Sequence, residues 1–299
     1  MTTYEAASAG PLNALSFDVE EYFQVSAFAG VVNRADWEDY PSRVQFNTTR
    51  VLDLLDEHRV RATFFVLGWV AERHPDLVRD IAARGHEIAC HGYSHQLVYN
   101  QSPGEFYEET KRSKQILEDL VGSPVRGYRA ASYSVTKKSL WALDTLMDLG
   151  FDYDSSIFPI THDRYGIADA PRAPHVATVG GRVGLVEFPM STAKMLGMNV
   201  PICGGGYFRL LPYAVTRAGL RKINRDDRRS FVFYLHPWEV DPDQPRIKAS
   251  LLSMFRHYNR LGSTYGNLQR LMQDFRFTTM AEVLDGLQGN LPEHDYIAA

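Results

Sequence analysis

The chain has 299 residues, of which 44% are hydrophobic and 23% are charged, and its formal net charge is -4 at pH 7. These values are ordinary for a globular protein. They give no general reason to expect nucleic acid or an anionic membrane as a partner. The two cysteines, Cys90 and Cys203, imply no disulfide framework.

The sequence carries no signal for membrane insertion or export. No apolar run reaches the roughly 18 residues that a bilayer-spanning helix needs. Residues 1–11 have neither the basic start nor the apolar core of a signal peptide. We therefore expect no transmembrane segment and a cytoplasmic location, and the oligomeric state stays open.

Short apolar runs alternate with longer segments of helical period, which is the pattern of repeated β-α units. The expected strands cover residues 14–17, 62–66, 87–89, 127–129, 151–153, 185–188 and 231–235. The expected helices cover residues 44–58, 74–84, 105–120 and 137–149. Seven strands with intervening helices predict an α/β fold, a barrel of parallel strands.

The pattern changes in the second half of the chain. Between about residues 155 and 212, glycine pairs and scattered prolines predict short strands and loops rather than a second domain. Residues 247–287 are mainly of helical period. We expect one domain, residues 13–288, with a C-terminal helical extension from about residue 247. The ends, residues 1–12 and 289–299, are expected to be flexible.

Chemically active side chains follow the ends of several expected strands. Asp18 and Glu20 follow the first strand, and His91 follows the third. Arg129 and His236 follow the fourth and the last. In barrels of parallel strands, functional residues collect at the carboxyl ends of the strands. The shared placement therefore predicts one site that contains all five residues.

Two histidines give the clearest metal-binding pattern. His91 and His95 are four residues apart, and Gly92 between them permits a tight turn. Two imidazoles with one carboxylate form a facial ligand set for a divalent metal and leave coordination positions open. The pair alone is weak evidence, because most histidines at this spacing are core or surface residues.

The acidic cluster supplies the carboxylate. In an extended strand Asp18 and Glu20 point to one face, whereas Glu21 points to the other. Asp18 and Glu20 therefore form the natural pair for a shared site, one on the metal and one beside it. The alternative is that Glu20 and Glu21 are solvated loop acids. That alternative fits Asp18 poorly, because this residue directly follows a buried apolar run.

Taken together and in order, these motifs resemble those of the polysaccharide deacetylases of the NodB-homology group, carbohydrate esterase family 4. Within that family the chain is similar to the branch associated with exopolysaccharide and PEP-CTERM gene clusters. The resemblance covers about residues 15–287. Its first motif matches residues 16–20, its metal motif residues 91–95, its arginine-containing third motif residues 129–133 and its leucine–histidine motif residues 235–236.

The resemblance implies a distorted (β/α)7 barrel and a metal-dependent hydrolase. Such an enzyme removes N-acetyl groups from N-acetylhexosamine units of a polysaccharide or its lipid-linked precursor and releases acetate. The metal is usually zinc, held here by Glu20, His91 and His95. Asp18 would be the general base and His236 the general acid, with Arg129 orienting Asp18.

The resemblance also implies substrate-binding residues. These are Ser132, Tyr133, Asp154 and Trp238, and a backbone N–H near Ser132 or Tyr133 would stabilise the oxyanion. Several of these residues have other readings. Trp238 and its neighbour Glu239 either line a sugar site or cap the rim of the barrel. Arg256 and His257 either reach the substrate or occupy an exposed helix face.

The chain departs from the family pattern in two places. Val19 stands where a second acid usually follows the first, so Glu20 must supply the ligand unless water replaces it. Ala131 stands where a proline is common, which leaves the local backbone shape open. The fourth motif is weak, and Asp154 is its best candidate.

Two other functions are consistent with these residues. One is a metal-dependent amidase acting on a small cyclic amide or ureide, for which a closed pocket rather than a long groove is expected. The other is a carbohydrate-binding barrel without catalysis. Asp18 and His236 argue against it, because binding needs neither a base nor an acid.

Overall fold

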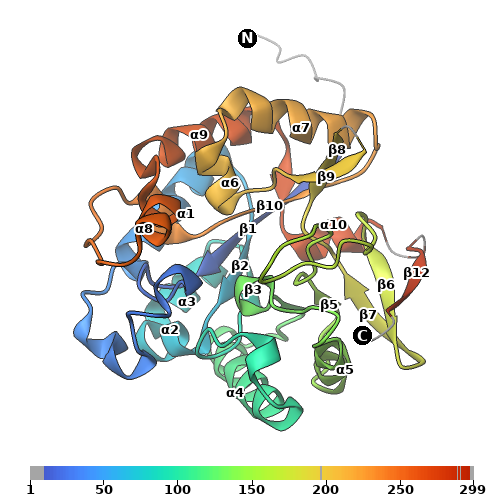
Figure 1. The fold of residues 1–299 in the computed structure, drawn as a ribbon, viewed down its shortest axis with the longest axis horizontal. Helices are drawn as coiled ribbons and strands as arrows, with labels where there is room; N and C mark the ends of the chain where they lie inside the picture. Colours follow the sequence, from blue (N-terminus) through green and yellow to red (C-terminus); the bar gives the residue numbers. More distant parts are fainter. Residues whose placement is uncertain (1–9, 196, 288, 290, 297–299) are drawn as a thin grey trace.

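The computed structural model describes residues 10–195, 197–287, 289 and 291–296. Among these residues a ten-stranded sheet has the order β10-β1-β2-β3-β4-β5-β7-β6-β12, with β11 beside β1 (Figure 1). Its strands are β1 (Asn13–Val19), β2 (Thr63–Val66), β3 (Glu87–Cys90), β4 (Gly127–Tyr128), β5 (Tyr153–Asp154), β6 (His175–Val179), β7 (Arg182–Glu187), β10 (Val232–Leu235), β11 (Phe277–Thr278) and β12 (Glu293–Tyr296). A separate antiparallel pair consists of β8 (Thr192–Met195) and β9 (Met198–Pro201).

Helices surround this sheet on its outer side (Figure 1). Within the described residues they are α1 (Val44–His58), α2 (Gly68–Arg73), α3 (Pro75–Ala83), α4 (Pro103–Val121), α5 (Trp141–Asp148), α6 (Gly205–Leu210), α7 (Tyr213–Arg225), α8 (Leu251–Tyr258), α9 (Leu261–Asp274) and α10 (Met280–Asp285). None of them has both the length and the apolar character that crossing a membrane requires.

The prediction of an α/β fold with a parallel sheet is confirmed, and the seven expected strands are present as β1, β2, β3, β4, β5, β7 and β10. The barrel is distorted, because the described strands run from β10 to β12 without closing into a ring. On the side of β10 that has no neighbouring strand, irregular chain at Ser191 and Cys203 forms hydrogen bonds with the strand. Ser191 Oγ accepts a hydrogen bond from Val232 N (2.9 Å), and Tyr234 N donates to Cys203 O (2.8 Å).

Local sequence signals explain where the helices begin and end. Ser102 caps α4 in a capping box with Glu105, with Pro103 in the first turn, and the helix ends at Gly122 in the left-handed conformation (φ 67°). This places the start of the helix two residues before the expected one. Helix α5 begins later than expected, because residues 136–140 form a turn in which Thr136 N donates to Ser139 Oγ (2.9 Å).

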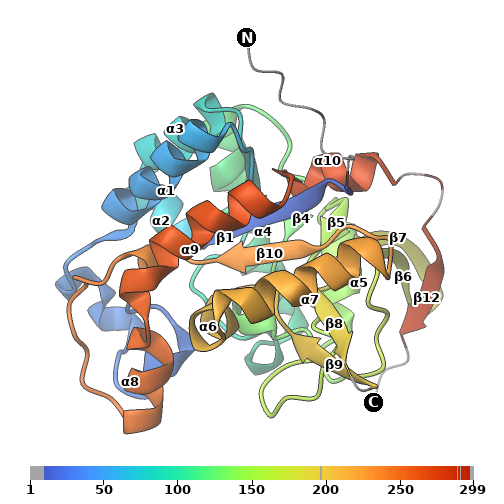
Figure 2. The same ribbon diagram turned by 90° about the horizontal axis from the view of Figure 1, so that it is seen from above.

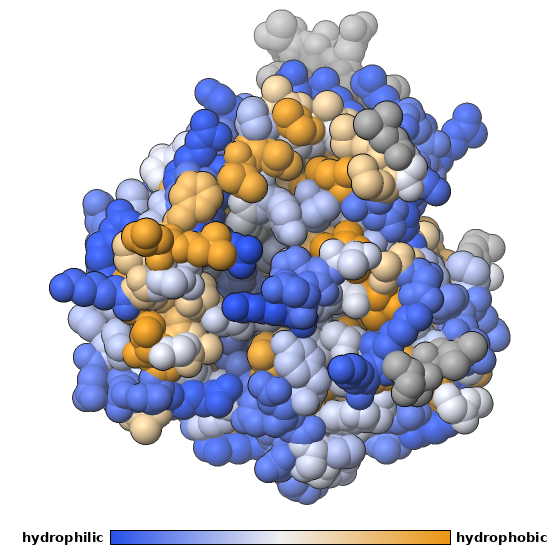
Figure 3. Space-filling model, viewed as in Figure 1, coloured by the Kyte–Doolittle hydropathy of each residue, from blue (hydrophilic) through white to orange (hydrophobic). Residues whose placement is uncertain are grey.

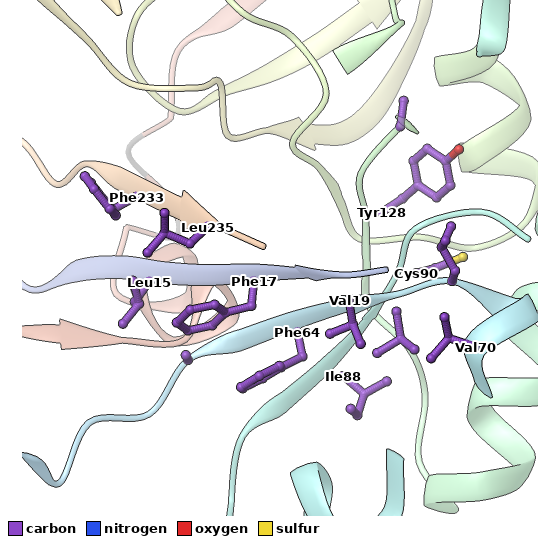
Figure 4. Packing of buried hydrophobic residues seen from close by; sticks show 14 of the residues in the cluster. Leu15, Phe17, Val19, Phe64, Val70, Ile88, Cys90, Tyr128, Phe233 and Leu235 are labelled. Atoms are coloured by element: carbon purple, nitrogen blue, oxygen red, sulfur yellow. The ribbon is translucent and has the colours of Figure 1, made fainter. Parts of the chain in front are cut away.

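Side chains of β1 point alternately to the outer hydrophobic core and to the interior of the barrel. Leu15, Phe17 and Val19 pack on the outer side of the sheet among side chains such as Phe64, Val70 and Ile88 (Figure 4). Successive side chains of a strand point to opposite faces, so Ser16 and Asp18 point inward. The packing of Leu15, Phe17 and Val19 on the outer side therefore directs the carboxylate of Asp18 into the barrel.

The C-terminal part of the chain returns to β1. Helix α9 lies alongside β1 and β10 (Figure 2), and β11 then pairs with Asn13 and Ala14 of β1. The tail differs from the expectation of a flexible segment at 289–299. Residues 293–296 form β12, which pairs in parallel with β6, and Tyr296 Oη lies 2.8 Å from His175 Nε2. The expectation for residues 1–12 falls mostly outside the described residues.

We expect that Gly204→Ala destabilises the protein by about 2 kcal/mol or more, because both steric overlap and backbone strain oppose a side chain here. Gly204 has φ 130°, and a Cβ at this position would overlap the carbonyl oxygen of Tyr234 in β10. Thermal or urea unfolding measures the effect. Gly206→Ala is the matched control, because a Cβ there meets nothing within 4 Å. Equal stability of the two variants would contradict the close approach of this segment to β10.

Candidate active site and metal centre

A buried ion pair lies at the carboxyl ends of the strands. Arg129 follows β4 and is fully buried, and its Nη1 donates to Asp18 Oδ1 (2.6 Å) and to Ser16 Oγ (2.9 Å). Its Nε and Nη2 donate to Ser155 O and Oγ (3.3 and 3.2 Å). The guanidinium also lies 4.0 Å from the ring centre of Phe65. Arg129 therefore fixes Asp18 against three neighbouring segments of the barrel.

Beside this pair, three side chains converge as a ligand set. One ligand atom from each of Glu20, His91 and His95 lies within 4.8 Å of the others, and all three residues are buried. Gly92 has φ 74° and His95 has φ 52°, so the expected tight turn after β3 is present. This turn brings the two imidazole rings to a centroid distance of 5.5 Å.

The charges and hydrogen bonds of the trio fit a divalent cation. Burial lowers the pKa of His91 to about 4, so the ring is neutral. Its Nδ1 lies 2.7 Å from the carbonyl oxygen of Arg129, to which Nδ1–H donates, so Nε2 is left for a metal. Burial alone would raise the pKa of Glu20, but His95 and His236 lower it to about 2.

An orphaned oxygen supports the same conclusion. Glu20 Oε2 is buried without a hydrogen-bond partner among the described residues. His95 Nε2 lies 2.9 Å from it, so the two ligand atoms point at the same space. One ionised carboxylate and two imidazoles suit zinc and related divalent cations. The donor set therefore fits a metal centre.

His236 lies on the other side of Glu20. Its Nε2 is 3.5 Å from Glu20 Oε1 and 4.0 Å from Asp18 Oδ2. Its Nδ1 is 2.8 Å from Glu239 Oε1, and Arg209 Nε donates to the other oxygen of Glu239 (2.6 Å). Burial alone would lower the pKa of His236, but the charges of Glu20, Glu239 and Asp18 raise it to about 9. The ring is therefore protonated at neutral pH.

Trp238 supports the site from behind and does not line the pocket. It is 5% exposed, its ring stacks on His236 at 5.0 Å, and its Nε1 donates to Glu20 Oε1 (3.3 Å). His257 stacks on the far side of Trp238 at 4.2 Å and is buried, with Nε2 2.7 Å from Gln244 Oε1. Neither reading of His257, substrate contact or exposed face, matches this position.

The turn after Arg129 presents backbone to the pocket. Ala131 begins a short 3-10 turn, and Ser132 and Tyr133 both have positive φ, 51° and 55°. Such strain persists only where the surroundings impose it. Tyr133 N donates to Ala130 O, whereas Ser132 N has no acceptor among the described residues. Ser132 lines the pocket, and the Tyr133 side chain is buried in the barrel.

Three residues in or beside the motifs occupy structural positions. Asp154 is fully buried, accepts from Ser156 Oγ (2.5 Å), and does not line the pocket. Val19 is buried in the outer core, so it leaves Glu20 as the ligand. Glu21 is not a solvated loop acid. It is buried and accepts hydrogen bonds from Arg43 N and Val44 N, which places its charge at the start of α1.

A pocket of about 940 Å³ opens over the site. His95, Ser132 and Tyr234 form part of its floor, and aromatic residues such as Tyr165 and Tyr207 form part of its wall. Figure 3 shows a hollow near the centre of this face, bordered by hydrophilic and hydrophobic residues. The pocket reaches the ligand trio through His95, and its space is large enough for several sugar units.

The sequence did not identify the residues that orient His236. From the sequence, Glu239 is expected either to contact a sugar or to cap the rim of the barrel, and no role is predicted for Arg209. One local signal was available. Glu239 stands three residues after His236 with Pro237 between them, which is the spacing of a capping box. No local signal points to Arg209, because it reaches Glu239 from α6.

Two family profiles match the chain. The polysaccharide deacetylase profile matches residues 36–153, and a domain of unknown function (DUF3473) matches residues 155–285. The two profiles meet at the end of β5. The second therefore covers the segments that carry His236, Glu239 and Arg209.

The chain is similar to curated deacetylases over part of its length. It is 34% identical over 131 residues to a peptidoglycan-N-acetylglucosamine deacetylase of Bacillus cereus, covering 42% of this chain and 46% of that protein. It is 58% identical over 109 residues to a chitooligosaccharide deacetylase of Rhizobium leguminosarum bv. trifolii, covering 32% and 51%. The chain spans about half the length of the curated relatives it matches.

The fold is also that of a solved structure. A protein of Mycobacterium smegmatis assigned to the polysaccharide deacetylases superposes with a TM-score of 0.64 at 21% identity, covering 96% of this chain and 94% of that one. The matched profile and the relatives agree that this chain is similar to the polysaccharide deacetylases over part of its length.

Proposed function

We propose that the protein is a metal-dependent hydrolase that removes N-acetyl groups from N-acetylhexosamine units of a polysaccharide or its lipid-linked precursor. The observation that carries this proposal is the position of Asp18 and His236 beside the Glu20, His91 and His95 trio, of which His95 lines the pocket. The names of the relatives, which act on peptidoglycan N-acetylglucosamine and on chitooligosaccharides, support the substrate class.

Glu20, His91 and His95 would hold the cation, which we propose to be zinc because imidazole ligands suit it. When bound, the ion supplies Lewis acidity, which polarises the acetamide carbonyl and makes water a better nucleophile near neutral pH. The residues around it bind, orient and transfer protons.

Asp18 is the proposed general base. Arg129 occupies Oδ1, so Oδ2 is directed toward the space between His236 and the ligand trio. A carboxylate held in this way accepts the proton of a water that attacks the carbonyl carbon. Arg129 has no other ion-pair partner among the described residues, and its bonds to Ser16 and Ser155 prevent Asp18 from turning away.

His236 is the proposed general acid. Glu239 fixes its Nδ1, so Nε2 faces the reacting centre and donates a proton to the departing amine. The backbone N–H of Ser132 is the proposed hydrogen-bond donor to the oxyanion. The products are acetate and a free amino sugar.

The size and openness of the pocket favour an oligosaccharide over a small cyclic amide or ureide. A space of about 940 Å³ exceeds what one small ring needs. An exopolysaccharide role and a cytoplasmic location are further proposals, which rest on the sequence. Cell fractionation tests the location. Acetate release from acetylated amino-sugar oligomers, with and without a chelator, tests the activity.

We expect that His91→Ala removes the metal, because a facial site that loses one of three protein ligands loses most of its affinity. Zinc content after dialysis, measured by elemental analysis, should fall from about one ion per chain to near zero. His58→Ala is the matched control, since His58 lies in the last turn of α1, away from the site. Full zinc occupancy in the His91→Ala variant would exclude the proposed centre.

We expect that Asp18→Asn lowers kcat by roughly 100-fold or more while zinc content stays unchanged, because the amide keeps the shape of the carboxylate but cannot accept the proton. The substitution also leaves the buried charge of Arg129 without its partner, at a cost of about 3–5 kcal/mol. Thermal unfolding must therefore show that the variant is folded at the assay temperature. A folded variant with near-wild-type kcat would rule out Asp18 as the base.

A further inference from the structure

Three arginines and no acidic residue are among the described residues that line the pocket over the site. Its lining includes Arg34 from the 3-10 helix Arg34–Asp39, Arg164 from the loop after β5, and Arg256 from α8. No aspartate or glutamate is among the described residues that line it. The whole chain has the opposite balance, with 36 acidic and 32 basic residues. Three distant segments therefore bring like charges to one opening.

These charges are not neutralised by protein carboxylates. Arg34 Nε donates to Ser94 O (2.9 Å), and its Nη2 lies 3.5 Å from His95 O, so two carbonyls fasten it to the loop that carries a metal ligand. In the described part of the chain, neither Arg164 nor Arg256 has an aspartate or glutamate oxygen within 4.0 Å. Asp163 lies beside Arg164 in sequence, but it contacts His162 Nδ1 (3.0 Å) and lines a neighbouring pocket.

Arg164 and Arg256 both lie near the ring of His162. Burial lowers the pKa of His162, the charge of Asp163 raises it, and the charges of Arg256 and Arg164 lower it, so both guanidinium groups lie near this ring. His162 stacks on Tyr165 with ring centroids 3.8 Å apart, and both residues line the pocket. Some arginines elsewhere, such as Arg84 and Arg126, pair with more than one carboxylate. Others, such as Arg59 and Arg270, have no carboxylate partner among the described residues. What sets Arg164 and Arg256 apart is that they line one pocket together.

A neutral acetylated sugar gives no reason for this arrangement. Guanidinium groups bind carboxylate and phosphate oxygens with two parallel hydrogen bonds, and an anion between several of them removes their mutual repulsion. Tyr165, Tyr207 and Phe255 line the same pocket and offer faces for pyranose rings. Guanidinium groups and aromatic rings in one pocket suit a sugar that carries an acidic group.

We propose that the substrate is an acidic glycan, and that Arg164 and Arg256, with Arg34, bind a carboxylate or phosphate next to the N-acetylhexosamine that is deacetylated. This inference rests on the proposed function, because it names the substrate class of the same site. It makes the arginines specificity-determining residues, and it assigns them no part in the chemical step.

The test compares three probes on the zinc-loaded protein. They are neutral N-acetylated chitotetraose, a hyaluronan tetrasaccharide that alternates N-acetylglucosamine with glucuronate, and UDP-N-acetylglucosamine, which carries phosphate. We expect kcat/KM for one acidic probe to exceed that for the neutral probe at least tenfold. The acidic probe with the higher kcat/KM shows whether the site prefers a carboxylate or a phosphate. Raising the salt concentration should reduce this preference, because screening weakens exposed ion pairs.

The double variant R164Q/R256Q should lower the ratio of acidic to neutral kcat/KM at least tenfold, mainly through KM. Arg270→Gln is the control, because Arg270 is exposed and lies outside this pocket, and it should leave the ratio unchanged. Equal turnover of all three probes, or a ratio that the double variant does not change, would overturn the inference.

Measurements of binding affinity test this inference independently of the proposed deacetylase activity. Calorimetric titration with each probe measures affinity even if no acetate is released. Tighter binding of an acidic probe that the double variant abolishes supports the arginine site, whatever the turnover. Absence of acetate from every probe would count against the deacetylase, and affinities that do not differ between acidic and neutral probes would count against the arginine site.

Discussion

The buried contact between Arg129 and Asp18 holds the active centre in its shape. A guanidinium without exposure to water is costly unless it is paired and fully hydrogen-bonded, and here Asp18, Ser16 and Ser155 provide the partners. These partners come from β1 and from the segment after β5, so one side chain ties together strand ends on both sides of β4. The carbonyl oxygen of Arg129 also orients His91. The same residue thus positions the proposed base and one of the proposed metal ligands.

A second arginine and carboxylate pair plays the corresponding part for His236. Burial alone would raise the pKa of Glu239, but Arg209 and His236 lower it to about 2, so Glu239 is ionised and holds Nδ1 of the histidine. Arg129 contacts Asp18 directly, whereas Arg209 contacts Glu239, and Glu239 in turn contacts His236. The result is one negative and one positive group facing each other across Glu20, which is the polarity that a base and an acid need.

Sequence reasoning succeeded where the chemistry follows local rules. The alternation of β1 placed Asp18 and Glu20 on one face, and Gly92 predicted the turn that joins His91 to His95, because both depend on neighbouring residues only. It failed where partners come from elsewhere in the chain. Arg209 reaches Glu239 from α6, and the role of Glu21 depends on α1 lying against the end of β1. Residues 293–296 read as a tail because their partner, β6, is more than 100 residues away.

The distribution of charge along the pocket follows from these pairs. Asp18 and Glu20 do not line the pocket, and they contact Arg129, His95 and His236, so these acids repel an anion less strongly than their charges alone suggest. The arginines at the opening have no such commitments within the described residues, and their field extends into solvent over roughly a Debye length, about 8 Å at physiological salt. In a chain whose net charge is negative, we propose that this opening attracts the acidic groups of the substrate. In this proposal, a polymer held by its acidic groups presents the neighbouring acetamide to the ligand trio, so the charges that select the substrate also orient it.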